Sequence, residues 1–206
     1  MSAIFHLIRH GRTVWNEEGR AQGHADSPLT ENAIYETQQK AVELAQETFD
    51  AIYSSDLGRT QHTAKIIGAH HPHLTIKTTS QLRERHFGDF EGKPFSELDA
   101  FREQAAQKAL QTLPTIDDHT WSPHPDMESS HQVATRVLSH LVQVSKQHDH
   151  KTTLIVTHGG VLTSILVDLK YATNEQLHGK VKNLSRVILI RENGQFRVEK
   201  TPDITI

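Results

Sequence analysis

Two short apolar runs, far apart in the chain, end in the same pair of residues, His-Gly. Residues 4–8 lead into Arg9-His10-Gly11, and residues 152–157 lead into His158-Gly159. Apolar runs of this length, closed by a turn residue, are typical of buried strands. The carboxyl ends of parallel strands meet at one edge of a sheet, where open α/β folds bind their ligands. We therefore expect His10 and His158 to face one site.

Strand-like and helix-like patterns alternate along the chain. A closing hairpin is expected because Asn193-Gly194 favours a tight turn between two short apolar stretches. Strands that alternate with helices predict a three-layer α/β/α fold with a mainly parallel, doubly wound sheet. The predicted strands lie at 4–8, 51–54, 74–78, 152–157, 187–191 and 196–199, and the predicted helices at 30–48, 55–69, 94–110, 130–148 and 161–169.

The length of 206 residues is sufficient for one domain with a full hydrophobic core. We predict a single domain over residues 1–206. A stretch at about 81–128 has neither the periodicity of a helix nor that of a strand, and it is rich in charge, aromatic residues and proline. It is expected to be an insert that shapes the substrate pocket.

The composition excludes several classes of function. The formal net charge is −3, without a basic block, so we expect no nucleic-acid partner. No apolar run reaches the roughly 18 residues that a membrane span needs, and no signal segment is evident, which predicts a cytoplasmic protein without a membrane partner. The chain has no cysteine, which rules out disulfides and thiolate catalysis. Homodimer formation is left open.

Sixteen histidines are a high count, and only one group of them is clustered. His70-His71-Pro72-His73 lies in a proline-containing turn without cysteine or acidic companions at metal-binding spacing. We interpret it as a solvated loop, and we predict no metal site. His6 alternates with apolar neighbours and is expected to pack within the sheet.

Two further residues carry side chains that are suited to phosphoryl transfer. Arg59 lies at a strand-to-helix junction, and Glu84 lies in the charged insert. With His10, His158 and Arg9 they supply imidazole, guanidinium and carboxyl groups. Guanidinium groups bind phosphate oxygens through forked, charge-assisted hydrogen bonds. This set therefore favours a site for a phosphorylated small molecule.

These residues lie in motifs that resemble the histidine phosphatase superfamily, in the branch of the cofactor-dependent phosphoglycerate mutases and their phosphatase relatives. The resemblance covers nearly the whole chain. The matching motifs are LIRHGRTVWN (7–16), QG (22–23), DSPLT (26–30), SDLGR (55–59), LRERHFGDFEG (82–92), ES (128–129) and THGG (157–160). The chain departs from the family pattern at Ala33, Thr60 and Met127, where we expect effects on packing rather than on phosphate binding.

The resemblance implies a role for each candidate residue. His10 would attack phosphorus and become a phosphohistidine, with its other ring nitrogen donating to a backbone carbonyl. Arg9 and Arg59 would clamp the phosphate oxygens, and His158 would add a donor and charge. Glu84 would protonate the leaving oxygen and later activate water. The remaining candidates for phosphate or substrate binding are Asn16, Gln22, Gly23, Arg85 and Gly159. The resemblance implies that neither a metal nor a cofactor is required.

A phosphomonoesterase acting on small phosphorylated metabolites is the preferred interpretation. The insert has no adjacent pair of arginines that would hold a second phosphate, and only Arg102 and Lys108 are available there. The sequence Glu84-Arg85-His86-Phe87-Gly88 nevertheless resembles the mutases, so phosphoglycerate mutase is an alternative. A catalytically silent phosphate-binding module and a metal-dependent hydrolase are two further alternatives.

Overall fold

A six-stranded sheet organises the chain in the computed structural model, which describes residues 2–206. The strand order is β3-β2-β4-β1-β5-β6. The first four strands in this order are parallel, and β5 and β6 are antiparallel to their neighbours. The predicted mainly parallel sheet is therefore confirmed. The strands are β1 Ser2–Arg9, β2 Ala51–Ser55, β3 Ile76–Thr79, β4 Thr152–Thr157, β5 Arg186–Glu192 and β6 Gln195–Lys200.

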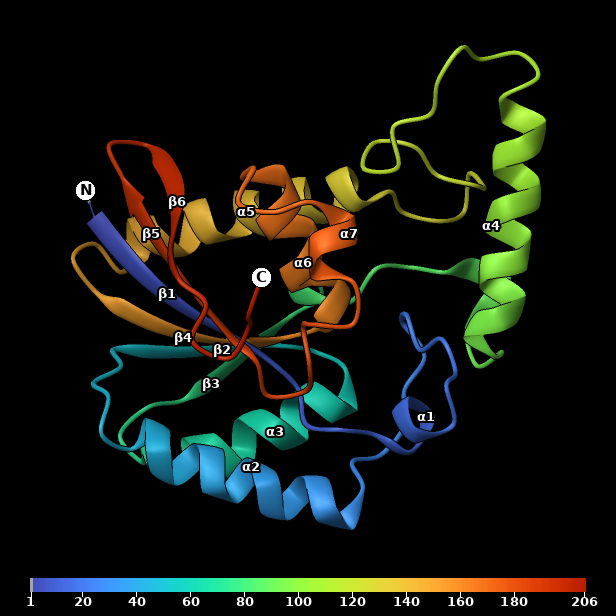
Figure 1. Cartoon of the computed structure of the whole chain (residues 1–206). Helices are drawn as coiled ribbons and strands as arrows, with labels where there is room; N and C mark the ends of the chain where they lie inside the picture. The colour runs from blue at the N-terminus through green and yellow to red at the C-terminus, as the bar shows by residue number, and fades with distance from the viewer. Residues whose placement is uncertain (1) are drawn as a thin grey trace.

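Helices cover both faces of the sheet, as the doubly wound prediction requires. Helices α2 (Glu31–Leu44) and α3 (Gly58–Gly68) pack on one face, and α5 (Ser130–Gln147) and α6 (Gly159–Asp168) pack on the other (Figure 1). Each interface buries its own apolar cluster. One cluster contains Ile8, Leu44, Ile52, Ile67 and Val156, and the other contains Phe5, Leu7, Val137, Leu141, Ile155 and Ile165.

Local sequence signals explain where these elements begin and turn. The side chain of Thr30 accepts a hydrogen bond from the Ala33 amide and caps α2, as predicted. Ser129 caps α5 in the same way, with Gln132 completing a capping box. The β5–β6 turn has φ values of 52° at Asn193 and 85° at Gly194, which is the conformation that the Asn-Gly pair favours.

The structure corrects several predicted boundaries. Helix α2 ends at Leu44 rather than at residue 48, and β3 begins at Ile76 rather than at residue 74. The one-turn helices α1 (Val14–Glu17) and α7 (Asn174–Leu177) were not predicted, because four residues are too few to show a helical period. No helix among residues 2–206 combines the length and the apolar content that crossing a bilayer requires.

The segment 81–128 begins against the sheet, where Leu82 joins the apolar core, and then leads away from it. It contains two short 3-10 helices, η1 (Ser80–Leu82) and η2 (Gly88–Phe90), followed by α4 (Phe95–Ala109), which lies far from the sheet in Figure 1. The segment shares a small apolar cluster with the loop that follows β1. That cluster contains Ala21, Phe87, Leu98 and Met127.

One prediction about the histidines holds only in part, since His70, Pro72 and His73 are exposed but His71 is not. His71 is buried and packs edge-on against Phe49, so the turn at residues 70–73 is not wholly solvated. The ring of His71 closes the end of the apolar cluster around Phe49. His6 packs against the same phenylalanine, as predicted for a residue of the sheet. The family departures Ala33, Thr60 and Met127 are all buried.

Candidate active site

Strands β1 and β4 lie side by side and bring His10 and His158 together. Arg9 of β1 pairs with Thr157 of β4, so the next residue of each strand lies at the same level. The ring centroids of His10 and His158 are 5.3 Å apart, with an angle of 67° between the ring planes. After β1 the chain continues to α2 on one face, and after β4 it enters α6 on the other. This divergence opens a crevice at the sheet edge, where open α/β folds bind ligands.

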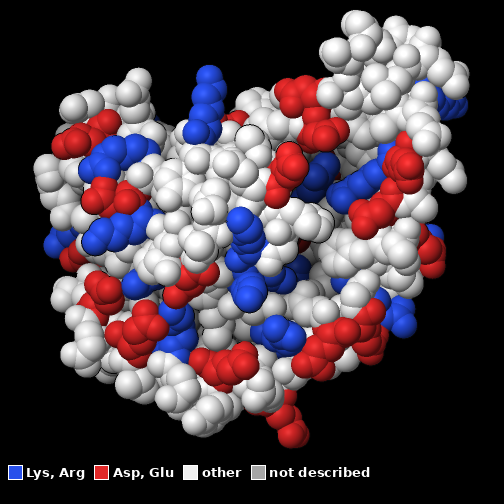
Figure 2. Space-filling model, viewed as in Figure 1, with Lys and Arg blue, Asp and Glu red and all other residues white. Residues whose placement is uncertain are grey.

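A cavity of about 670 Å³ occupies this crevice. Nine of the ten sequence-predicted site residues line its wall: Arg9, His10, Asn16, Gln22, Gly23, Arg59, Glu84, Arg85 and Gly159. The tenth, His158, has no exposed surface and lies behind His10 rather than in the wall. Figure 2 shows basic side chains gathered in the hollow between the main body and the lobe that carries α4.

His10 is held in one orientation. Its Nδ1 lies 2.7 Å from the carbonyl oxygen of Gly11, and only 2% of the residue is exposed. Burial lowers the pKa of His10 well below its usual value, and the charges of Arg59 and Arg9 lower it further. A neutral ring that donates through Nδ1 carries its lone pair on Nε2. His10 is therefore arranged as a nucleophile.

His158 is also neutral in this surrounding. Burial lowers its pKa well below the usual value, and Arg59, His10 and Arg9 add to the effect. Neither ring nitrogen has a hydrogen-bond partner within the protein. A bound anion beside the ring would favour its protonated form.

The two arginines differ in their freedom to bind a ligand. Arg59 is fully buried, and its terminal nitrogens donate to the carbonyl oxygens of Gly23 (2.8 Å) and Ala25 (2.7 Å) and to Asp26 Oδ1 (2.9 Å). It thus holds the loop that follows α1, as well as lining the cavity. Arg9 donates from Nη1 to the carbonyl oxygen of Val181 at 2.6 Å.

Glu84 reaches from the insert to the beginning of α6. One carboxylate oxygen accepts from the Gly160 amide at 3.0 Å, and the other accepts from the Arg85 amide at 2.8 Å. A Cβ atom at Gly160 would overlap the Glu84 carboxylate in its present position, so a larger residue there would displace the carboxylate. The bonds place the carboxyl group in the wall of the cavity that also contains His10.

Several buried polar atoms at this site lack partners among residues 2–206. They include the Nε atoms of Arg9 and Arg59, Oε1 of Gln22 and both ring nitrogens of His158. Unpaired buried donors and acceptors are rare in folded proteins because each is costly. The two arginine nitrogens among them are donors in the cavity wall that an anionic ligand would satisfy.

The sequence analysis did not identify Asn183. Its Nδ2 donates to the His10 carbonyl oxygen at 3.0 Å and to Asn16 Oδ1 at 3.2 Å. Because β5 runs antiparallel to β1, the residues that precede β5 lie at the edge where β1 ends. The predicted closing hairpin could have pointed to Asn183. The residues that precede the first strand of that hairpin lie at one edge of the sheet.

The insert adds a second basic group to the cavity wall. Arg85 and Arg102 both line it, although 17 positions separate them in the sequence. Burial lowers the pKa of Arg85 to about 10, and the charge of Arg102 contributes to the shift. Arg102 lies over the ring of Phe87, with 5.4 Å between the guanidinium carbon and the centroid. The sequence contains no adjacent arginine pair here, but the fold brings two arginines into one wall.

Comparisons with known proteins identify similar sequences and similar folds. The sequence profile of the histidine phosphatase superfamily (branch 1) matches residues 5–204. A probable phosphoglycerate mutase of Yersinia pestis, GpmB, is 35% identical over 185 residues, which are 88% of this chain and 83% of the relative.

Two solved structures extend the likeness to the whole fold. YhfR of Bacillus stearothermophilus superposes with a TM-score of 0.81 at 31% identity, covering 98% of both chains. A mycobacterial glucosyl-3-phosphoglycerate phosphatase superposes with a TM-score of 0.79 at 26% identity, covering 100% of both chains. Mutases and phosphatases are thus both among the similar proteins.

Proposed function

Because this chain belongs to branch 1 of the histidine phosphatase superfamily, we propose that it is an enzyme that hydrolyses phosphomonoesters of small metabolites through a phosphohistidine at His10. One observation carries the proposal: a buried, neutral His10, oriented by the Gly11 carbonyl group, lies beside two arginines and His158. A neutral imidazole among fixed positive charges is suited to attack an anionic phosphoryl group.

In the first half of the reaction, Nε2 of His10 forms a bond to phosphorus while the bond from phosphorus to the ester oxygen breaks. The carboxyl group of Glu84 gives its proton to that oxygen, and the alcohol leaves. Nε of Arg9 and Nε of Arg59 have no protein partner and are available to the phosphoryl oxygens. Charge that develops on these oxygens is stabilised by donors already in place.

In the second half, water attacks phosphorus and the bond to Nε2 of His10 breaks. Glu84, now a carboxylate, takes the proton from the water and is ready for the next cycle. His10 returns to its neutral form, and inorganic phosphate leaves. The enzyme recovers its starting state without a net change in its own protons.

Arg85 and Arg102 support a substrate whose leaving group is acidic. The two guanidinium groups lie in the cavity wall beyond the phosphate-binding residues, where a carboxylate of the leaving group would pair with them. The names of the Yersinia relative and of the mycobacterial phosphatase both refer to phosphoglycerates, which carry a carboxylate next to the phosphate ester.

The proposal is tested with an aryl phosphate and the purified full-length chain. We expect steady release of phosphate and an acid-labile phosphoryl group on the protein during turnover. His10→Ala should abolish both, whereas His62→Ala, at an exposed position of α3, should retain both. Binding of phosphate without turnover in the unmodified protein would identify a binding module instead. Loss of turnover in a strong chelator would favour the metal-dependent alternative.

Phosphoglycerate mutase is the second candidate, and the shared wall of Arg85 and Arg102 favours it. A mutase must hold two anionic groups of its substrate at once, and this wall supplies a second group of positive charge. Rates of phosphate release and of interconversion of 2- and 3-phosphoglycerate should be measured on the same preparation. We expect hydrolysis to be faster, and dominant isomerisation would replace the hydrolase proposal with the mutase one.

A further inference from the structure

Three side chains with metal-ligating atoms converge outside the active site. His119 comes from the loop after α4, His131 from the first turn of α5, and Asp168 from the last turn of α6. Their nearest ligating atoms all lie within 4.8 Å of one another. Nε2 of His119 lies 3.0 Å from Asp168 Oδ1, and Nδ1 of His131 lies 2.7 Å from the same oxygen.

The cluster is partly enclosed, and its carboxylate is ionised. The side chains of His119 and Asp168 are 16% and 21% exposed, and that of His131 is 52% exposed. Burial alone would raise the pKa of Asp168, but hydrogen bonds from His119 and His131 lower it overall, so the carboxylate is charged. Nδ1 of His119 is buried without a partner. The ring proton lies on that nitrogen when Nε2 binds another group.

We propose that His119, His131 and Asp168 form a binding site for a divalent cation of the zinc type. Zinc prefers imidazole nitrogen and carboxylate oxygen at about 2.0–2.2 Å, in tetrahedral sites that water often completes. Such a tetrahedron separates neighbouring ligand atoms by about 3.3–3.5 Å. The two His–Asp168 pairs, now at 3.0 and 2.7 Å, would therefore move slightly apart, and all three atoms already lie within 4.8 Å of one another. Each ring then presents an unprotonated nitrogen and keeps its proton on the other one.

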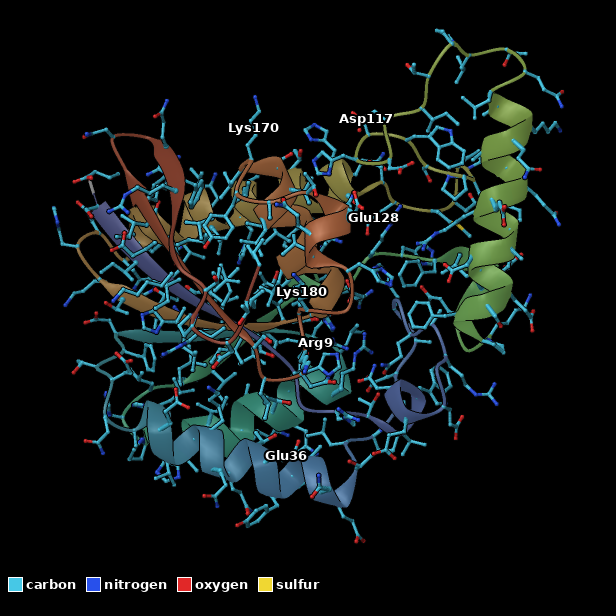
Figure 3. All side chains as sticks on the ribbon, in the orientation of Figure 1. Arg9, Glu36, Asp117, Glu128, Lys170 and Lys180 are labelled. Carbon is cyan, nitrogen blue, oxygen red and sulfur yellow. The ribbon has the colours of Figure 1, made fainter. Side chains whose placement is uncertain are left out.

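The position of this site separates it from the proposed catalytic centre. Helix α6 begins beside His10 and ends at Asp168, and its ten residues span about 15 Å. In Figure 3, Asp117 and Lys170 lie near the end of α6, and Arg9 lies near its beginning. The cation is therefore not a participant in phosphoryl transfer. It would join the loop of the insert to α5 and α6, and so fix the lobe that forms part of the cavity wall.

The amide of His131 already bonds to the His119 carbonyl oxygen at 2.8 Å, which ties the same loop to the beginning of α5. The contacts of the His119 and His131 rings with Asp168 form a second connection, which depends on side chains from three different elements. A cation held by those side chains would stabilise the loop without changing the helices. The proposal therefore predicts both a binding event and a local loss of mobility.

Titration of the metal-free full-length chain with Zn²⁺, against a competing chromophoric chelator, tests the binding. We expect one tight site per chain and at least a tenfold loss of affinity in Asp168→Asn and in His119→Ala. His124→Ala, an exposed histidine of the same loop, is the matched control and should bind as tightly as the unmodified chain. Equal affinity in all four proteins, or no tight site at all, would overturn the proposal.

A second measurement covers the case in which a variant loosens the loop by itself. Hydrogen exchange of residues 110–128 should slow at least threefold when Zn²⁺ is added to the unmodified chain, and should not respond in His131→Ala. His131 is half-exposed, so its replacement leaves the core intact. Exchange that is the same with and without Zn²⁺ in the unmodified chain would contradict the proposal, whatever the phosphatase activity.

Discussion

Among single residues, the histidines show how strongly surroundings decide chemistry. His10 and His158 sit in a buried, positively charged environment that lowers the pKa of both rings and keeps them neutral. The sequence predicted that the two rings would meet, because each follows a strand of one parallel sheet. It did not predict that His158 would be fully buried, since burial depends on residues such as His10 and Arg59 that lie far from it in the sequence.

Replacing Gly160 by alanine tests the contact between Glu84 and α6. The new Cβ would overlap the carboxylate, which must move away from the Gly160 amide. We expect kcat for an aryl phosphate to fall by about 10²-fold, since general acid–base catalysis typically contributes 10²–10⁴-fold. The comparison is Glu84→Gln, whose kcat should be as low or lower. A Gly160→Ala variant with unchanged kcat would mean that Glu84 is not the acid.

His6 is expected to make the fold less stable in acid. Burial lowers its pKa to about 4, with Arg186 adding to the shift and Glu47 opposing it. Between pH 6.5 and 4 the unfolded chain takes up a proton that the folded chain does not, so stability is lost as the pH falls through this window. The free energy of unfolding should fall less steeply in His6→Leu over the same range, as measured by urea denaturation. An identical slope would contradict the assignment, and His62→Leu serves as the control.

The positions of other site residues depend on contacts between distant parts of the chain, which no local sequence pattern predicts. Arg59 was expected to clamp phosphate, but its terminal nitrogens hold the loop at Gly23, Ala25 and Asp26. Arg102 joins Arg85 only because α4 folds back over the cavity. These pairings link residues that are 17 to 36 positions apart, and hydrophobic periodicity does not specify them.

At the scale of elements, α5 holds the segment that carries Glu84. Both nitrogens of the Arg136 fork bond to the Glu128 carboxylate, at 2.8 and 2.9 Å, and the same guanidinium group donates to the carbonyl oxygens of Gln81, Arg83 and Glu84. This single side chain thus ties η1 and the residues after it to α5. Arg136 is a positioning residue, since it acts on the reaction only through Glu84.

Arg136→Met should therefore impair catalysis more than binding. Loss of the fork frees the backbone at Glu84, and a small misplacement of a catalytic group typically costs about 10-fold or more in rate. We expect kcat to fall by about that factor while KM for an aryl phosphate changes less than threefold. Arg136→Lys should recover part of the loss. A change in KM alone would show that Arg136 acts on substrate binding instead.

The presence and type of the helices and strands were the most predictable features of the fold. All six strands were expected, and so were the five longer helices, because each has a clear period or a strong cap such as Thr30. The errors were at the ends of elements, in the four-residue helices α1 and α7, and in the 3-10 helices η1 and η2, which lie in a stretch predicted as a loop. The path of the insert was not predictable, because its small apolar cluster around Phe87 and Leu98 forms with a loop more than 60 positions earlier.

At the scale of the whole molecule, charge is unevenly distributed. The chain carries a net charge of −3, yet the cavity wall contains Arg9, Arg59, Arg85 and Arg102 with Glu84 as its only acidic residue among those that the structure describes. Long-range attraction between a basic cavity and an anionic substrate raises the association rate and is screened by salt. Because the net charge of the chain is negative, this attraction is confined to the cavity.

Raising the ionic strength should consequently lower kcat/KM. Between roughly 0.02 and 0.3 M salt the Debye length shortens from roughly 20 Å to below 10 Å, so we expect a several-fold decrease. Arg102→Gln should show a shallower dependence, while Lys65→Gln, on the exposed face of α3, should follow the unmodified protein. Parallel salt dependence in all three proteins would indicate that Arg102 does not contribute to attraction of the substrate.

The neighbouring positions of β1 and β4 have a consequence for the engineering of this protein. One histidine of the pair is synthesised near the start of the polypeptide and the other about three quarters of the way along it, with the exposed stretch 111–115 between them. A chain divided in that stretch yields two inert halves, each holding one ring. Activity would return only when the halves find each other, so the fold offers a natural reporter of whether two attached proteins meet.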